Sequence, residues 1–79
     1  MNRYHRYQAT IKRVNRAVAK AGIPLELVRG EGYHYFVFDT ANRWESVSIY
    51  LPYTNTVSVD CWVEWAKQAM DEINNRVAA

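Results

Sequence analysis

The sequence predicts an α+β domain with the element order α-β-β-β-α, in which two helices pack on one face of a three-stranded antiparallel sheet. Apolar residues recur with helical spacing near both ends of the chain, and three short runs of strand-forming residues lie between them. No linker, repeat or low-complexity stretch interrupts the 79 residues, so we expect a single domain over residues 1–79. Two helices on one sheet face are the simplest packing of these elements.

The first helix is expected from about Arg3 to Ala21. Apolar side chains recur there three or four positions apart, as on one face of an amphipathic helix. These positions are Tyr4, Tyr7, Ile11, Val14, Val18 and Ala21. Gly22 is typical of the position after a helix end, and Pro24 prevents the helix from continuing.

Three strand-forming runs follow. Residues 25–28 form a short run that ends in a glycine-rich turn. Residues 33–38 are dense in aromatic and β-branched side chains, which favour strands. A polar hairpin loop is expected over residues 39–43. The third run, residues 46–51, alternates polar and apolar side chains and is ended by Pro52.

The second helix is expected to begin after Ser58, which is a favourable N-cap residue. Asp60 in the first turn suits the positive end of the helix dipole, and Val57 and Trp62 are spaced as a hydrophobic staple. The apolar face of this helix is expected to contain Trp62, Val63, Ala66, Ala69, Met70, Ile73 and Val77. A separate, solvated side is expected to contain Asp60, Glu64 and Asp71.

The middle strand must direct one set of alternating side chains away from the helices. Because tyrosine tolerates water better than phenylalanine, we expect Tyr33 and Tyr35 on the uncovered face, with Tyr50 of the next strand beside them. A tyrosine-rich face without cover is typical of a docking surface for a partner. The alternatives are that these tyrosines are simply strand formers, or that they are buried in a homodimer.

Charge is distributed unevenly along the chain. Residues 1–25 contain six of the ten basic residues and none of the eight acidic ones, which the net charge of +2 conceals. The basic side chains opposite the apolar face of the first helix are Arg6, Arg13, Arg16 and Lys20. Such a surface can contact phosphates or an acidic protein, or it is an ordinary solvated helix face.

Few residues offer catalytic chemistry. His34 is the one candidate general base, although a lone histidine within an aromatic strand is more often structural. Cys61 is expected to pack, because no histidine lies near it in the sequence. Trp65 lies beside the apolar face of its helix and is expected at the core edge or in an interface. Phosphate-binding loops, catalytic triads and metal-ligand spacings are absent from the sequence, so we expect no enzyme activity, metal or cofactor.

The expected location is a host cell cytosol. A single cysteine permits no disulfide within the chain, which suits a reducing compartment. No apolar run approaches the about 18 residues of a membrane span, and the basic N-terminus is not followed by the apolar block of a secretory signal.

The middle of the chain resembles small proteins encoded by bacteriophages and prophages. The resemblance covers roughly residues 22–70 and is carried by residues 32–39, 45–50, 53–55 and 62–64. Small phage proteins often disable host machinery, and anti-CRISPR inhibitors are the best-known class. The resemblance therefore implies an inhibitor that binds a host protein complex, such as a CRISPR effector, through the tyrosine-rich face and the basic helix.

A second resemblance leads to an alternative function. The element order is that of double-stranded-RNA-binding domains, and Gly32 with His34 is similar to the Gly-Ser-His motif of HicA-type toxin ribonucleases, whose histidine is catalytic. This implies an RNA-binding or RNA-cleaving module that uses His34. Two departures oppose it: Tyr33 replaces the motif's serine, and Asp60 lies at the start of the second helix, where the RNA-binding domains carry lysines.

Overall fold

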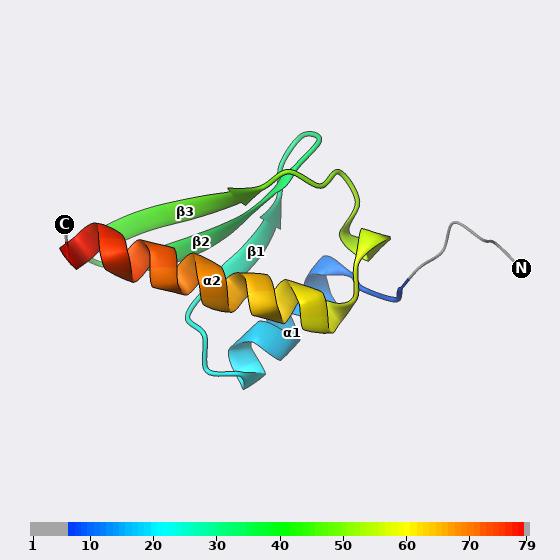
Figure 1. The fold of residues 1–79 in the computed structure, drawn as a ribbon, viewed down its shortest axis with the longest axis horizontal. Coiled ribbons are helices and arrows are strands. Elements are labelled where there is room, and N and C mark those ends of the chain that lie inside the picture. The colour runs from blue at the N-terminus through cyan, green and yellow to red at the C-terminus, as the bar shows by residue number, and fades with distance from the viewer. Residues whose placement is uncertain (1–6, 79) are drawn as a thin grey trace, which may run out of the picture.

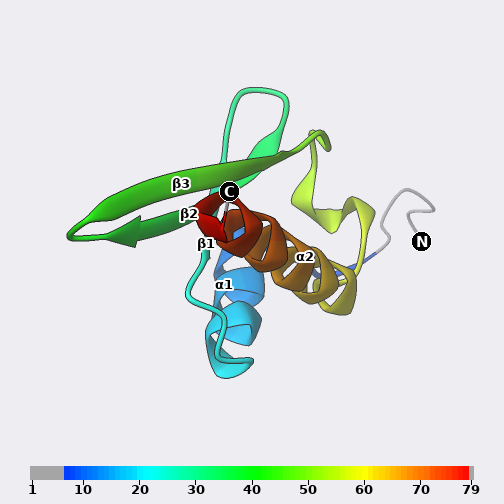
Figure 2. The ribbon, with the colours of Figure 1, turned by 60° about the vertical axis from the view of Figure 1, so that its left-hand side comes forward.

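The computed structural model describes residues 7–78 and has the predicted α+β architecture (Figure 1). Its elements are α1 (Ile11–Lys20), β1 (Glu26–Arg29), β2 (His34–Thr40), β3 (Arg43–Ile49), the short 3-10 helix η1 (Thr54–Thr56) and α2 (Val59–Ala78). The strands form one antiparallel sheet in the order β1-β2-β3. Both helices lie on the same side of this sheet, and no element of residues 7–78 covers its other face (Figure 2).

The register of the sheet decides which side chains form the core. Leu27, Phe36 and Val47 are neighbours across the three strands and face the helices. Trp62 of α2 packs against them, with its ring centroid 6.1 Å from that of Phe36 in an edge-on arrangement. Burying Trp62 and Phe36 completely removes two large apolar side chains from water, which is the main stabilisation available to a chain of this size.

The first helix is shorter than the apolar spacing predicted. Residues 7–10 are not helical, and Thr10 caps α1 by accepting a hydrogen bond from the Arg13 backbone at 3.2 Å. Because the Thr10 hydroxyl satisfies an amide that has no partner within the helix, the helix begins at the next residue. Tyr7 therefore lies outside α1 despite its helical spacing, and residues 3–6 of the prediction lie outside the described residues.

The hairpin between β2 and β3 is tighter than predicted. Both strands extend into the predicted loop, and only Ala41 and Asn42 form the turn. The polar residues stay in the strands because they find partners there. Arg43 lies 5.6 Å over the Phe38 ring, and its backbone carbonyl accepts a hydrogen bond from the Thr40 hydroxyl at 3.2 Å. At its other end, β3 stops at Ile49 rather than at residue 51, and the Leu51 backbone N–H donates to the Ile49 carbonyl at 2.9 Å in the turn that follows.

The second helix has the predicted start, and its described side chains have the predicted faces; the side chain of Val77 lies outside those that the structure describes. Ser58 caps the helix through a 3.1 Å hydrogen bond from the Cys61 backbone to the serine hydroxyl. Its fully buried side chains are Trp62, Ala66, Ala69 and Ile73, whereas Asp60, Glu64 and Asp71 are exposed as predicted. Cys61 is partly buried. Over the described residues, neither α1 nor α2 combines the length and apolar character that crossing a membrane requires.

Candidate functional site

The uncovered face of the sheet carries the three tyrosines that the sequence predicted there. Tyr35 is paired with Val28 and Ser48 across the sheet, on the side away from the core. The ring of Tyr33 lies 5.7 Å from that of Tyr35 and stacks at 6.3 Å on that of Tyr50. We call Tyr33, Tyr35 and Tyr50 the tyrosine face. Because Tyr50 is 82% exposed, this cluster of rings is open to solvent.

Trp44 adds a fourth aromatic side chain to the same side of the sheet. It alternates along β3 with the core-facing Val47 and Ile49, and it is 59% exposed. The sequence did not place Trp44 on this face, because the residue lies between the predicted loop at residues 39–43 and the predicted strand that begins at residue 46. Its position next to the strand-forming run at residue 46 was the available signal.

A glycine turn positions the ring of Tyr33. The backbone N–H of Gly30 donates a 2.8 Å hydrogen bond to the Tyr33 carbonyl, which closes the turn between β1 and β2. A Cβ atom at Gly30 would lie only 2.6 Å from the Tyr33 ring. Gly32 in the same turn has a φ of +83°, a conformation that L side chains rarely adopt. The turn therefore has room for the tyrosine because residue 30 has no side chain.

The basic side of α1 is exposed but lies away from the tyrosine face. Arg13, Arg16 and Lys20 are all solvent-exposed, as predicted, whereas Arg6 lies outside the described residues. Figure 2 shows α1 on the covered side of the sheet, and the pairing of Tyr35 with Val28 and Ser48 places the tyrosine face on the opposite side. The structure therefore does not bring the two predicted partner-binding surfaces together.

His34 is buried and forms hydrogen bonds through both ring nitrogens. Nδ1 lies 2.7 Å from the Leu51 carbonyl and Nε2 lies 2.7 Å from the Thr54 hydroxyl. Because a carbonyl oxygen only accepts, Nδ1 carries the proton of that bond. The Thr54 carbonyl in turn accepts a 2.8 Å hydrogen bond from the Trp62 indole. These bonds attach the segment after β3 to the core.

This environment is unlike that of a general base. A general base must reach the proton that it removes, whereas the His34 side chain has no solvent-exposed surface. The structure thus places His34 in a structural network. Within residues 7–78, no group of three His, Cys, Asp or Glu side chains is arranged to hold a metal ion.

A cluster of charges joins the end of α2 to β3. Glu45 accepts hydrogen bonds from Arg43 at 3.1 Å and from Arg76 at 2.9 Å. Arg43 also donates to the Ile73 carbonyl at 2.7 Å. The hydrogen bonds from Arg76 and Arg43 hold the pKa of the Glu45 carboxyl below its ordinary value. These charged hydrogen bonds therefore hold the end of α2 against β3.

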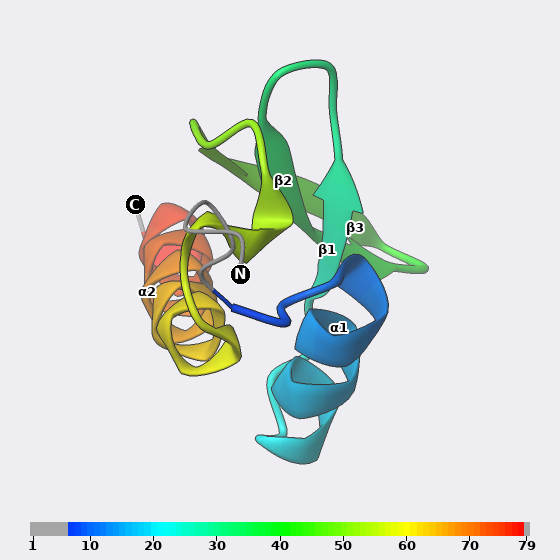
Figure 3. The ribbon, with the colours of Figure 1, turned by 90° about the vertical axis from the view of Figure 1, so that its right-hand side faces the viewer.

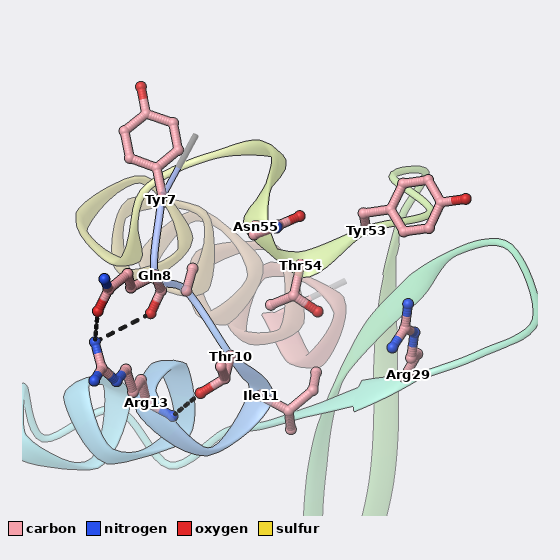
Figure 4. A pocket seen from close by; sticks show the side chains of 10 residues that line it. Tyr7, Gln8, Thr10, Ile11, Arg13, Arg29, Tyr53, Thr54 and Asn55 are labelled. Atoms are coloured by element: carbon pink, nitrogen blue, oxygen red, sulfur yellow. Dashed lines mark hydrogen bonds between the residues drawn. The ribbon is translucent and has the colours of Figure 1, made fainter. Parts of the chain in front are cut away.

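An open cavity of about 630 Å³ lies on another side of the molecule (Figure 4). It is formed by residues 7–11 and Arg13 at the start of α1, by Arg29 at the end of β1, and by residues 53–55 of the η1 segment. Figure 3 shows the chain before α1 crossing from the α2 side of the molecule to the β1 side, below η1. Because the cavity unites segments that are distant in the sequence, sequence periodicity does not predict it.

A smaller hollow of about 370 Å³ lies between β3 and α2. Trp65 lines it and packs edge-on against Trp62 at a centroid distance of 5.2 Å. Trp65 therefore covers the edge of the core, which was one of the two positions expected for it.

Comparisons with protein families, curated proteins and solved structures found no match for this chain.

Proposed function

We propose that this chain is a binding protein that docks on a partner protein through the tyrosine face. The observation that carries the proposal is the ring cluster of half-buried Tyr33 and Tyr35 and exposed Tyr50, in which Tyr33 lies against both of the others, on a sheet face that no element of the described chain covers. Tyrosine and tryptophan dominate the binding energy of many protein interfaces, because they bury a large area and lose little conformational entropy. Trp44 is a further exposed aromatic side chain on the same side of the sheet, six residues along the chain from Tyr50.

The proposed partner is a host protein complex, and more narrowly a defence complex of the CRISPR-effector type. This choice is supported by the resemblance of residues 22–70 to phage and prophage proteins. The basic side chains of α1 would contribute through long-range attraction to an acidic partner, which raises association rates without direct contact.

The alternative of a ribonuclease that uses His34 has weaker support. The exposed Arg13 and Arg16 favour contact with phosphates. The buried position of His34 and the acidic Asp60 at the start of α2 oppose it. A second copy of the chain on the tyrosine face is the other alternative.

The test is affinity capture from host lysate with three baits: the wild type, a Tyr35→Ala/Tyr50→Ala variant and a Tyr53→Ala control. Tyr53 is also exposed but lies outside the tyrosine face. We expect a protein that the wild type and the control retain and that the double variant loses. With that protein purified, each tyrosine-face substitution should reduce affinity by about 1–3 kcal/mol.

Two results would contradict the proposal. One is equal retention of the captured protein by all three baits. The other is a concentration-dependent dimer, measured by analytical ultracentrifugation, that the double variant abolishes, because the face would then be occupied by a second copy.

A further inference from the structure

We infer that the cavity between α1, β1 and η1 binds a short stretch of single-stranded nucleic acid, with arginines contacting phosphates and tyrosines stacking on bases. This ligand site is separate from the tyrosine face and does not depend on its function. It also differs from the predicted RNA site, because His34 takes no direct part in it.

The positively charged side chains that line the cavity favour an anionic ligand. Arg13 and Arg29 lie at opposite ends of the cavity, and no acidic residue lines it (Figure 4). Among the described residues, neither arginine has a carboxylate within ion-pair distance, whereas Arg43 and Arg76 are both paired with Glu45. The cavity therefore contains two positive charges that the described part of the chain does not neutralise.

Both guanidinium groups donate hydrogen bonds to carbonyl oxygens. Because a carbonyl oxygen carries no net charge, these bonds orient the guanidinium groups without neutralising their positive charge. Nη1 of Arg13 donates to the backbone carbonyl of Gln8 at 3.4 Å and to its side-chain Oε1 at 3.2 Å. Nη2 of Arg29 donates to the Pro52 carbonyl at 3.5 Å. A guanidinium has five N–H donors, so each arginine keeps donors for phosphate oxygens.

Aromatic rings at the rim distinguish nucleic acid from an acidic peptide. Tyr7 is 48% exposed and Tyr53 is 62% exposed, and both rings project from the edge of the cavity (Figure 4). Grooves for single-stranded nucleic acid combine basic residues with aromatic rings on which the bases stack. The side-chain amide of Asn55 adds a hydrogen-bonding group between the rings.

Core side chains hold the segment of the cavity wall that contains Tyr53 and Asn55. Thr54 between them is buried, and it is held by His34 through its hydroxyl and by Trp62 through its carbonyl. A wall held by two core side chains does not have to be ordered when the ligand binds, which favours affinity. His34 is thus a positioning residue for this cavity.

The test uses fluorescein-labelled hexauridylate, with binding followed by fluorescence anisotropy at about 50 mM and about 200 mM salt. We expect saturable binding that weakens steeply with salt. Arg13→Gln and Arg29→Gln should each weaken it about tenfold, whereas Arg16→Gln should change it less than about twofold. Arg16 is the matched control, because it is an exposed arginine on the same helix and does not line the cavity.

A second pair of variants tests whether the aromatic rings at the rim of the cavity contribute to binding. Tyr53→Ala should weaken binding about tenfold, and Tyr50→Ala on the tyrosine face should leave it unchanged. As a measurement on the wild type, the ligand should shift the amide NMR signals of Thr10 and Asn55 and leave that of Ser48 on the outer sheet face unshifted.

Three results would overturn the inference. The first is no saturable binding at the lower salt concentration. The second is an equal loss of affinity for Arg16→Gln and Arg13→Gln, which would mean diffuse attraction by the whole helix. The third is competition by hexaglutamate as strong as that by unlabelled hexauridylate, because the site would then bind any polyanion.

Discussion

The side chain of Asn15 forms the two hydrogen bonds with the Leu27 backbone that a neighbouring strand would otherwise form. The Leu27 backbone N–H donates to Asn15 Oδ1 at 2.6 Å, and Asn15 Nδ2 donates to the Leu27 carbonyl at 3.0 Å. In the antiparallel pair of β1 and β2, these two backbone groups point away from β2, towards the open edge of the sheet. One amide therefore attaches α1 to β1 and satisfies groups that would otherwise lose water without gaining a partner.

Replacing Asn15 with alanine should destabilise the fold by about 1–3 kcal/mol, because two partly buried backbone groups lose their hydrogen bonds. The higher helix propensity of alanine offsets only a few tenths of that loss. Urea unfolding followed by circular dichroism measures the change. Asn75→Ala on the exposed side of α2 is the control and should stay within about 0.5 kcal/mol. Equal stability of the two variants would show that water replaces the Asn15 amide without loss.

The hydrogen bond between Thr54 and His34 should also contribute to stability. Thr54→Val keeps the shape of the side chain and leaves Nε2 of the buried His34 without its partner. We expect a loss of about 1–3 kcal/mol in the free energy of unfolding. Thr56→Val, at an exposed position of η1, should change it by less than about 0.5 kcal/mol. An unchanged free energy of unfolding for Thr54→Val would contradict the structural role assigned to His34.

Gly30→Ala should displace the Tyr33 ring from the tyrosine face. The new methyl group would meet the far end of a side chain, so the ring can rotate away and the fold should persist. The stacking of Tyr33 on Tyr50 would then be lost. In NMR spectra, we expect the ring-proton shifts of Tyr50 to move towards those of an isolated tyrosine. Unchanged Tyr50 shifts would mean that the turn, rather than the ring, adapts to the added methyl group.

The faces of the sheet could be predicted from the sequence because strand alternation is local. Once Tyr33 and Tyr35 are assigned to the outside, His34 and Phe36 must point inwards, and the structure has them fully buried. The start of α2 was predictable for the same reason, since the Ser58 cap acts within one helical turn. Each of these features depends on residues only a few positions apart.

The start of α1 is an exception among these local features: the Thr10 cap also acts within one helical turn, but the apolar spacing continues past it to Tyr7, so the spacing predicts a longer helix. Features that depend on distant segments could not be predicted. The pairing of Asn15 with Leu27 and the presence of Arg13 and Arg29 in one cavity require the folded positions of α1 and β1. Sequence periodicity contains no information on such contacts, because it describes one element at a time.

The contacts of Glu45 with Arg76 and Arg43 should make stability depend on acid pH. These arginines lower the pKa of the Glu45 carboxyl in the folded protein below its ordinary value of 4.5. The folded state therefore binds a proton at this group less readily than the unfolded state does. The stabilisation is fully present above about pH 4.5 and is lost as the pH falls through the lowered folded pKa.

Glu45→Gln removes this titrating group, so the variant should be less stable than the wild type at neutral pH. The difference should shrink as the pH falls through the acid range, which urea unfolding midpoints at about pH 7, pH 5 and pH 3 would measure. Glu64→Gln is the control, because the carboxylate of Glu64 pairs only with the exposed Lys67 and such surface pairs contribute little. A stability difference for Glu45→Gln that stays constant down to pH 3 would instead show that its carboxylate acts through packing and not through its charge.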